Sequence, residues 1–256
     1  MKIATFNANS VRVRLPILLD WLATNEPDVL AIQETKCEDH VFPHEDFEDL
    51  GYHVTCHGQK SYNGVALLSR EAPLATRTGF GDPAWPEDCR IVVGQYRDFV
   101  LLNTYVPNGT KVGSEKWDYK LRWLDRMHEY LQGLIAGPLP VIWLGDINIA
   151  PTPDDVYESH RHLGNVGHHP DEFKRLSALV ELGLTDVFRK FTEGPGHYTY
   201  WDFFLKNALD RKLGWRIDHI YTTQALTDRC VECIIDAEPR RAERPSDHTF
   251  VMATFD

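Results

Sequence analysis

Residues 141–148 read VIWLGDIN, a run of apolar residues followed by a glycine and two polar side chains. The consecutive β-branched and aromatic residues of Val141–Leu144 predict a buried strand. An ordinary strand terminus needs neither an aspartate nor an asparagine directly after it. Because the same pattern recurs along the chain, it supports predictions of both the fold and the functional site.

Further apolar runs also predict buried strands. They are Ile3–Phe6, Val29–Ile32, Val65–Leu68, Ile91–Tyr96, Phe99–Tyr105, Ile217–Tyr221 and Phe250–Phe255. Amphipathic spacing predicts helices over about Arg14–Ala23 and Glu115–Ile135, and a third helix that begins near Asp171, after Pro170, and ends at Gly183. About eight to twelve strands with few helices indicate two sheets packed face to face, with the helices outside.

Length and composition are those of an ordinary globular protein. The chain has 256 residues, of which 43% are hydrophobic and 25% charged, and no linker-like segment interrupts it. We therefore expect a single domain over residues 1–256. The absence of a long apolar run and of a signal-peptide pattern predicts a cytoplasmic protein without a membrane segment. The odd, scattered set of five cysteines predicts free thiols.

The formal net charge of −11 argues against a protein that binds nucleic acid through bulk positive charge. A nucleic-acid enzyme with this charge would need its carboxylates gathered around a divalent cation. It would also need a local basic stripe to bind phosphates.

Polar side chains stand at the ends of six of the predicted strand segments. They are Asn7, Glu34, Tyr105, Asn108, Asp146, Asn148, Asp218, Asp247 and His248. Each of them alone is more simply explained as a solvated strand end or turn. The agreement among six segments favours one convergent site instead.

The residue types in this set indicate metal-assisted hydrolysis. Carboxylates at Glu34, Asp146, Asp218 and Asp247, with the imidazole of His248, form a hard-oxygen environment that suits Mg²⁺ or Mn²⁺ better than zinc. The asparagine amides can bind a phosphate or a nucleophilic water without adding negative charge. Since no cysteine is placed as a nucleophile, hydrolysis by a metal-activated water is the expected chemistry.

The motifs occur in the order found in a known family. They are NAN at 7–9, IQETK at 32–36, NTYVPNG at 103–109, GDIN at 145–148 and SDH at 246–248. Further matches are YNGVA at 62–66, Arg90, YK at 119–120, GLTD at 183–186 and RID at 216–218. The sequence resembles the exonuclease III family of abasic-site (AP) endonucleases, within the endonuclease/exonuclease/phosphatase superfamily. The resemblance covers residues 3 to 255, although GDxN alone also occurs across the wider superfamily.

The resemblance implies a four-layered α/β sandwich in which helices flank two packed mixed β-sheets, as in DNase I-like proteins. It implies a DNA repair phosphodiesterase, a class II AP endonuclease that also has 3′-5′ exonuclease and 3′-end trimming activity. The implied partner is double-stranded DNA with abasic sites or 3′ ends, and the implied cofactor is Mg²⁺, with Mn²⁺ as the alternative. We expect the protein to act as a monomer.

The resemblance also implies a role for each site residue. Glu34 would be the principal metal ligand, with Asn9 and Asp247 near the metal or one contact further out. Asp146 would orient and deprotonate the attacking water, helped by Asn148. His248, held by Asp218, would contact the scissile phosphate. The phosphate oxygens or the leaving group would be bound by Tyr105, Asn7 and Asn108. The sequence leaves open how the roles are divided between Asp146 and Tyr105. It also leaves open whether one or two metal ions are bound.

Contacts with DNA are predicted from basic and aromatic residues. Arg90 and Lys111 are the favoured contacts to backbone phosphates. Five other basic residues either contact DNA phosphates or simply lie on a solvated surface, and the sequence leaves both interpretations open: Lys36, Lys60, Lys116, Lys120 and Arg122. The resemblance implies that Tyr200, Trp215 and Ile217 line a pocket for the flipped abasic sugar.

The segment 198–204, YTYWDFF, departs from the usual bacterial motif. Tyr200 stands where a tryptophan is usual, and Phe204 stands where an arginine is usual. The later GWRID at 214–218 is closer to the eukaryotic form. Phe204 is a candidate wedge into DNA. These departures leave the balance between exonuclease and abasic-site activity open.

Two alternatives compete with the DNA repair interpretation. One is a phosphatase or phospholipase on the same scaffold, and the other is a non-catalytic DNA-binding module that kept the fold. NTYVPNG and the aromatic pair Tyr200 and Trp215 match the DNA-acting branch. The second alternative is disfavoured because every expected catalytic position is filled.

Overall fold

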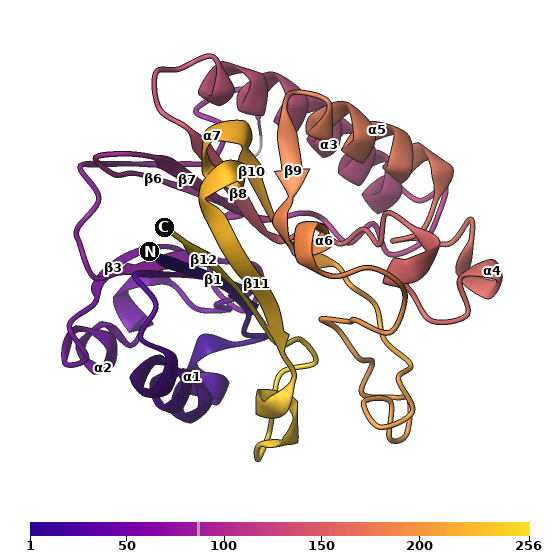
Figure 1. Ribbon diagram of the computed structural model, residues 1–256, viewed down its shortest axis with the longest axis horizontal. Coiled ribbons are helices and arrows are strands. Elements are labelled where there is room, and N and C mark those ends of the chain that lie inside the picture. The colour runs from indigo at the N-terminus through magenta and orange to yellow at the C-terminus, as the bar shows by residue number, and fades with distance from the viewer. Residues whose placement is uncertain (86–87) are drawn as a thin grey trace.

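A computed structural model describes residues 1–85 and 88–256 of the chain. Within these residues, twelve strands form two six-stranded sheets that stack face to face, and helices cover their outer faces (Figure 1). The four-layered α/β sandwich predicted from the sequence is confirmed. None of the helices in the described part of the chain is long and apolar enough to cross a bilayer.

The first sheet contains the strands nearest the two termini. Its order is β11 (Cys230–Asp236), β12 (Phe250–Phe255), β1 (Lys2–Asn7), β2 (Val29–Gln33), β4 (Val65–Ser69) and β3 (His53–His57). Only β1 and β2 pair in parallel among these strands. Helices α1 (Val11–Asn25) and α2 (His44–Glu48) lie on its outer face (Figure 1).

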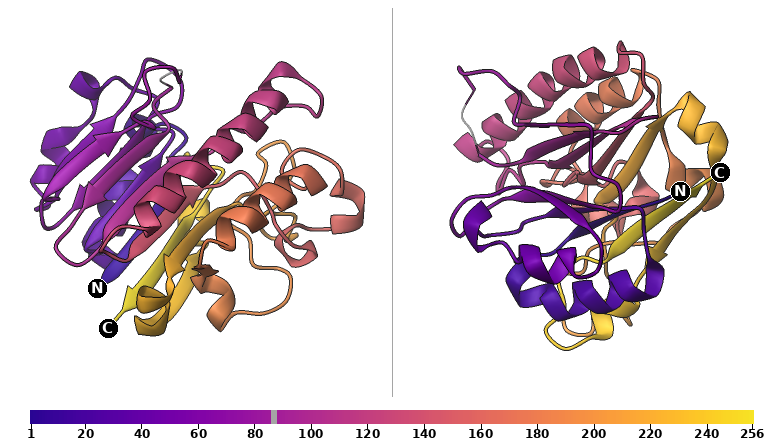
Figure 2. Two further views of the ribbon diagram at one scale, coloured as in Figure 1. Left: turned by 90° about the horizontal axis from the view of Figure 1, so that it is seen from above. Right: turned by 90° about the vertical axis from the view of Figure 1, so that its left-hand side faces the viewer.

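The second sheet contains the strand predicted at Val141–Leu144. Its order is β5 (Ala75–Thr78), β6 (Ile91–Gln95), β7 (Val100–Tyr105), β8 (Val141–Asp146), β10 (Asp218–Thr223) and β9 (Leu184–Asp186). Here β7 and β8 are the parallel pair. Helices α3 (Glu115–Ile135) and α5 (Pro170–Val180) pack side by side over its outer face (Figure 2).

Shorter helices lie in the connections. They are α4 (Ser159–His162), α6 (Val187–Phe191) and α7 (Gln224–Arg229), with 3₁₀ helices η1 (Asp39–Val41), η2 (Pro153–Asp155) and η3 (Glu238–Arg241).

Central strands are apolar throughout because both of their faces are buried. In β8, Ile142 and Leu144 point into the core between the two sheets, whereas Val141 and Trp143 point toward the side chains of α3. Residues alternate between the two faces of a strand, so a strand with a layer on each side needs apolar residues at every position. This is why VIWL predicted a buried strand.

Every predicted strand overlaps an observed one, and the differences have physical reasons. Strand β5 was missed because all of Ala75–Thr78 is exposed, and β3, β9 and β11 also carry polar or exposed positions. The first helix runs from Val11 to Asn25, longer at both ends than the predicted Arg14–Ala23. Pro16 lies beyond the first turn of this helix and does not end it, although proline has no N–H to donate to the carbonyl of Arg12.

Candidate active site

Strand register brings the polar strand ends to one edge of the sandwich. In the second sheet, Asp146 lies opposite Tyr105 in the parallel pair β7/β8 and opposite Asp218 in the antiparallel pair β8/β10. In the first sheet, Asn7 ends β1 and Glu34 directly follows β2. The Asn7 side chain joins the two sheets, because its Nδ2 donates to Glu34 Oε1 at 2.9 Å and to Asp146 Oδ2 at 2.8 Å.

Gly145 explains why a glycine precedes the aspartate in this strand. Its φ is +131°, and a Cβ at this position would lie 2.1 Å from the carbonyl oxygen of Thr104 in the neighbouring strand. No side chain fits there, so the close approach of β7 and β8 beside Asp146 depends on glycine.

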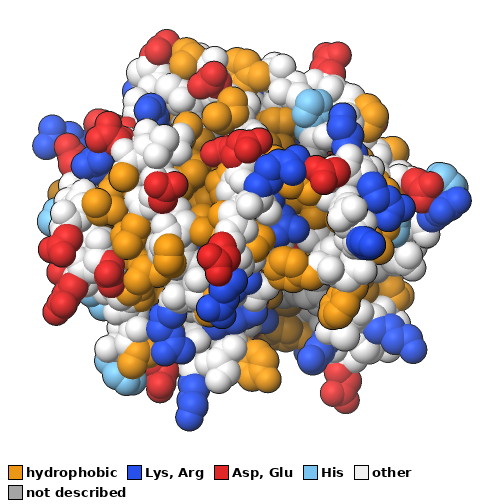
Figure 3. Space-filling model, turned by 90° about the horizontal axis from the view of Figure 1, so that it is seen from below, with side chains coloured by type: hydrophobic (Ala, Val, Ile, Leu, Met, Phe, Trp, Pro, Cys, Tyr) orange, Lys and Arg blue, Asp and Glu red, His pale blue; other side chains and the backbone are white. Residues whose placement is uncertain are grey.

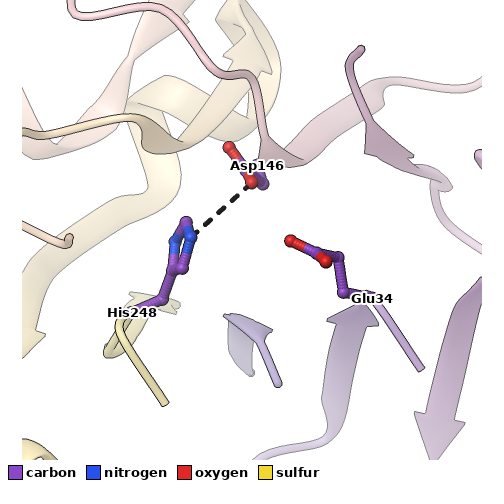
Figure 4. A group of neighbouring side chains, drawn as sticks. All are labelled: Glu34, Asp146 and His248. Atoms are coloured by element: carbon purple, nitrogen blue, oxygen red, sulfur yellow. Dashed lines mark ion pairs between the residues drawn. The ribbon is translucent and has the colours of Figure 1, made fainter. Parts of the chain in front are cut away.

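Three ligand-bearing side chains converge at this edge. One ligand atom from each of Glu34, Asp146 and His248 lies within 4.8 Å of the others. Figure 4 shows the three side chains pointing toward a shared space from the ends of β2 and β8 and from the segment before β12. The two carboxylates supply oxygen donors that fit a hard divalent cation, and the imidazole of His248 lies beside them.

Asn9 and Asp247 lie beside this cluster and bond each other. Asn9 Nδ2 donates to Asp247 Oδ1 at 2.9 Å, and the Asn9 Oδ1 accepts a hydrogen bond from Lys36 Nζ. The same ammonium lies 2.9 Å from Glu34 Oε2. Lys36 therefore partly balances the negative charge of Glu34, rather than projecting freely toward a ligand.

His248 is buried against Asp218. Its Nδ1 lies 2.8 Å from Asp218 Oδ2, and its Nε2 lies 3.8 Å from Asp146 Oδ2. Burial alone would lower the pKa of His248, but the carboxylates of Asp218 and Asp146 raise it to about 10. The two carboxylates therefore favour the protonated imidazole at neutral pH.

Asp146 and Tyr105 differ in their proton affinities. Burial raises the pKa of Asp146 to about 7, with His248 opposing the shift. Burial, together with the carboxylates of Glu34 and Asp146, raises the pKa of Tyr105 well above its ordinary value. Tyr105 is thus a neutral phenol that can donate a hydrogen bond, whereas Asp146 can exchange a proton near neutrality.

Asn148 and Asn108 extend the site on the side of the second sheet. Asn148 adopts a left-handed conformation with φ +53°, and its backbone N–H donates to Asp146 Oδ1 at 2.9 Å. Asn108 Nδ2 donates to Asn148 Oδ1 at 3.1 Å. The Asn148 amide therefore lies next to the Asp146 carboxylate, and the Asn108 amide lies next to Asn148.

A cavity of about 460 Å³ opens from this cluster. Its polar end is lined by Glu34, Asp146, Asp247 and His248. The rest of the lining is largely apolar and forms an aromatic wall that includes the three residues assigned to a sugar pocket, Tyr200, Trp215 and Ile217. It also includes residues that sequence reasoning did not single out: Tyr157, His162, Val166, Gly167, Asp202, Leu205 and Leu213. An anionic group could enter the carboxylate-rich end only if a bound cation neutralised the carboxylates, whereas the aromatic wall can contact an apolar group directly.

Comparison with known proteins identifies the family. The model of the endonuclease/exonuclease/phosphatase family matches residues 4–248, nearly the whole chain. The chain belongs to this family.

Relatives within the family act on DNA. Exodeoxyribonuclease III of Haemophilus influenzae is 34% identical over 268 residues, covering 100% of both proteins. The structure of an AP endonuclease from Archaeoglobus fulgidus superposes with a TM-score of 0.96 at 43% identity, covering 100% of this chain and 99% of that one. The structure of NExo of Neisseria meningitidis, a 3′-5′ exonuclease, superposes with a TM-score of 0.94 at 37% identity, and the match covers 100% of both chains. NExo from Neisseria has also been solved as a 3′ phosphatase bound to a product DNA hairpin.

The basic residues assigned to DNA have different surroundings in this family member. Arg90 is half-buried, lies 2.5 Å from Asp88, donates to the Tyr105 carbonyl at 3.1 Å and stacks over the Tyr105 ring at 4.7 Å. Lys111 is exposed and lies outside the residues that line the cavity. Figure 3 shows one face of the molecule, on which Lys and Arg side chains lie among Asp, Glu and hydrophobic side chains.

Both interpretations of Lys120 were wrong. Neither a phosphate contact nor a solvated face is compatible with its position, because its side chain is 0% exposed and its Nζ lies 2.5 Å from Glu172 Oε1. By contrast, Lys60, Lys116 and Arg122 are exposed. Phe204 is 96% exposed and thus free to contact a ligand.

Sequence reasoning missed the buried polar groups that support the site. Asn103 Nδ2 donates to the carbonyls of Ile32 and Ala66, and its Oδ1 accepts from Gln33 Nε2, so this amide ties the two sheets together. Arg216 is buried between Asp155 and Asp186, which fixes the segment before Asp218. The available signal was a polar residue inside an otherwise apolar run, as at Asn103.

Proposed function

We propose that the chain cleaves the backbone of double-stranded DNA at abasic sites and trims 3′ ends, using a divalent cation. As a family member with exodeoxyribonuclease III and AP endonuclease relatives, the chain is a hydrolytic nuclease of DNA repair. The observation that carries the proposal is the convergence of Glu34, Asp146 and His248 at the polar end of a cavity with an aromatic wall.

The cation is assigned to Glu34, with Asn9 and Asp247 supporting it. Mg²⁺ is the proposed ion, because the nearby groups are mainly carboxylate and amide oxygens, and Mn²⁺ is the alternative. A bound divalent cation supplies charge neutralisation for the phosphate oxygens. Lys36 and Asn7 hold the Glu34 carboxylate in place, since each bonds one of its oxygens.

Asp146 is assigned to the attacking water. Its carboxylate is oriented by the Asn7 amide and by the Asn148 backbone N–H. The raised pKa of Asp146 favours acceptance of a proton from water near neutral pH. Asn148, next to it, is placed to hold the same water.

His248 and Tyr105 are assigned to the phosphate. The protonated imidazole of His248, held by Asp218, can stabilise the negative charge that develops on a phosphate oxygen. The neutral phenol of Tyr105 can donate a hydrogen bond to a phosphate oxygen or to the leaving group. Asn108 donates one of its two amide N–H groups to Asn148, which leaves the other for a phosphate oxygen. Both amide N–H groups of Asn7 bond Glu34 and Asp146, so we assign Asn7 to orienting these two carboxylates.

The aromatic wall is assigned to the sugar. Tyr200, Trp215 and Ile217 line the cavity next to His248, so an extruded sugar would lie with its phosphate toward the carboxylates. A nucleotide that has lost its base is the least costly to extrude, since it has no stacking or pairing to give up.

We assign Arg90 and Lys111 to backbone phosphates. We also propose that the active form is a monomer with a single domain.

A duplex assay tests this function. Purified protein is incubated with duplexes that carry one abasic analogue, a 3′-phosphate or a recessed 3′ end, with Mg²⁺, with Mn²⁺ or with EDTA. We expect cleavage at the abasic analogue and processing of both 3′ ends only when metal is present. Failure to act on any of the DNA substrates, with hydrolysis of a soluble phosphate monoester or a phospholipid instead, would favour the alternative function.

A further inference from the structure

One buried ion pair connects the loops around the site. Lys120 of α3 and Glu172 of α5 are both 0% exposed, and Lys120 Nζ lies 2.5 Å from Glu172 Oε1. Removing two charges from water costs about as much as their attraction returns, so such a pair contributes little to net stability. Its placement beside the active site indicates a different role.

Lys120 bonds the backbone of both asparagine loops. Its Nζ donates to the carbonyl of Asn148 at 2.8 Å and to the carbonyl of Asn108 at 3.1 Å. With Glu172 as the third acceptor, all three N–H donors of the ammonium are used. The side chain thus joins the loop after β7 to the loop after β8.

Glu172 bonds a third loop. Its Oε1 accepts from the backbone N–H of Gly167 at 3.1 Å, and its Oε2 accepts from the N–H of His169 at 3.1 Å. Gly167 lines the cavity, and its carbonyl accepts from the N–H of Ala150 at 2.7 Å. The ion pair therefore links the cavity wall to the two loops that carry Asn108 and Asn148.

These loops have backbone conformations that need support. Asn148 has φ +53°, a left-handed conformation that is uncommon for a residue other than glycine. Gly109 has φ +92°, and a Cβ there would lie 3.1 Å from Lys120 Cδ, so the loop packs directly on the lysine stem. A bond from Lys120 to each carbonyl holds both turns in place.

We propose that Lys120, paired with Glu172, is a positioning residue of the active site. It holds the Asn108 and Asn148 backbones so that their amides face the cavity beside Asp146, and it touches neither phosphate nor metal. The proposal rests on the proposed function, because it gives these two asparagines a part in phosphodiester hydrolysis.

Charge-removing variants test this role. Lys120→Met, Glu172→Gln and the double variant are compared with Arg175→Met, which breaks the pair between Arg175 and Asp125 on the same two helices. Neither Arg175 nor Asp125 bonds the three loops, so the control reports only the loss of a helix–helix ion pair. Rates and KM are measured on the duplex that the wild type cleaves best, along with thermal stability and Mn²⁺ affinity.

We expect the double variant to melt below the wild-type temperature, because the carbonyls of Asn108 and Asn148 lose their buried donor, but to stay folded, because both buried charges are removed together. Its kcat should fall about 10- to 100-fold, since small displacements of positioning groups have effects of this size. KM and Mn²⁺ affinity should stay within about twofold to threefold of wild type, and Arg175→Met should keep its kcat.

Three outcomes would overturn the proposal. They are a folded double variant with wild-type kcat, a loss that appears only in KM, and a fall in Mn²⁺ affinity that accounts for the slower rate. If variants of Lys120 do not fold, the isosteric Glu172→Gln decides, and a wild-type kcat in that variant overturns the proposal. A wild type that processes 3′ ends but not abasic sites contradicts the proposed function instead, and the kcat comparison then uses the 3′ end.

Discussion

Asp218→Asn should disable His248 in a manner that depends on pH. The carboxylates of Asp218 and Asp146 raise the pKa of His248 to about 10, against the effect of burial. An asparagine keeps the shape of the side chain but removes the charge at the 2.8 Å contact. The imidazole pKa should then fall toward its ordinary value of about 6.5, because burial opposes the effect of the remaining carboxylate of Asp146.

The size of the effect follows from the protonated fraction. With a pKa of about 6.5, roughly three quarters of the imidazoles are protonated at pH 6 but only about 3% at pH 8. The wild-type imidazole stays protonated over this range. If the charged ring stabilises the phosphate, the ratio of wild-type to Asp218→Asn rates should grow from about 1.3 at pH 6 to about 30 at pH 8.

The assay is single-turnover cleavage of an abasic-analogue duplex at saturating protein and Mg²⁺, from pH 6 to pH 8. The wild-type rate is divided by the variant rate at each pH. Groups that titrate in the same way in both proteins then cancel from the ratio. His248→Ala serves as the control, and its ratio to wild type should change little with pH. The double variant Asp218→Asn/His248→Ala should be hardly worse than His248→Ala alone.

A ratio that is constant with pH would refute the reasoning, since Asp218 would then act by something other than the imidazole charge. Rate losses that add up in the double variant would also refute it. If Asp218 acts only through the proton on His248, removing Asp218 has no further effect once the imidazole is gone.

The remaining predictions address the metal, stability and the pocket. Glu34→Ala should lower the activity mainly by weakening metal binding, so excess Mn²⁺ should partly restore the rate. If the variant needs no more metal than the wild type does, the assignment of Glu34 is contradicted. His248 has a raised pKa, so its stabilising contribution is full below about pH 6.5 and is lost as pH rises through about 10. In EDTA, the melting temperature of wild type should therefore fall more steeply between pH 7 and 10 than that of His248→Ala, and parallel curves would contradict this. Replacing both Tyr200 and Trp215 with Ala should reduce cleavage at abasic sites and also reduce discrimination against intact nucleotides. An unchanged abasic-to-intact ratio in a destabilised protein would show that the two aromatics only pack.

The sequence predicted the fold where burial makes each position apolar. VIWL at 141–144 lies between two layers, so its run of apolar residues had no other simple explanation. Strand β5 gave no such signal, since Ala75–Thr78 lies exposed at the edge of its sheet. Strand formation there depends on pairing with β6, a tertiary contact that no local pattern reveals.

The presence of polar residues at strand ends also selected side chains that the structure brings together at one edge of the sandwich. This happens because parallel β7 and β8 end together, which places Tyr105 beside Asp146. Strand ends cannot reveal supporting groups in helices. Lys120 appeared to be a surface lysine because its partner, Glu172, lies on another helix 52 residues later, and only the packing of α3 on α5 buries both.

The central claim is that one cluster at the sheet edge performs metal-dependent hydrolysis of DNA, with Asp146 acting on the water. The most direct measurement is the single-turnover rate at one abasic analogue for wild type and Asp146→Asn, with duplex affinity measured alongside. An asparagine keeps the shape of Asp146 but cannot accept the proton, so the variant should bind the duplex normally and react about 10²-fold or more slowly. Near-normal turnover by Asp146→Asn, or cleavage by wild type that is as fast in EDTA as in Mg²⁺, would contradict the account.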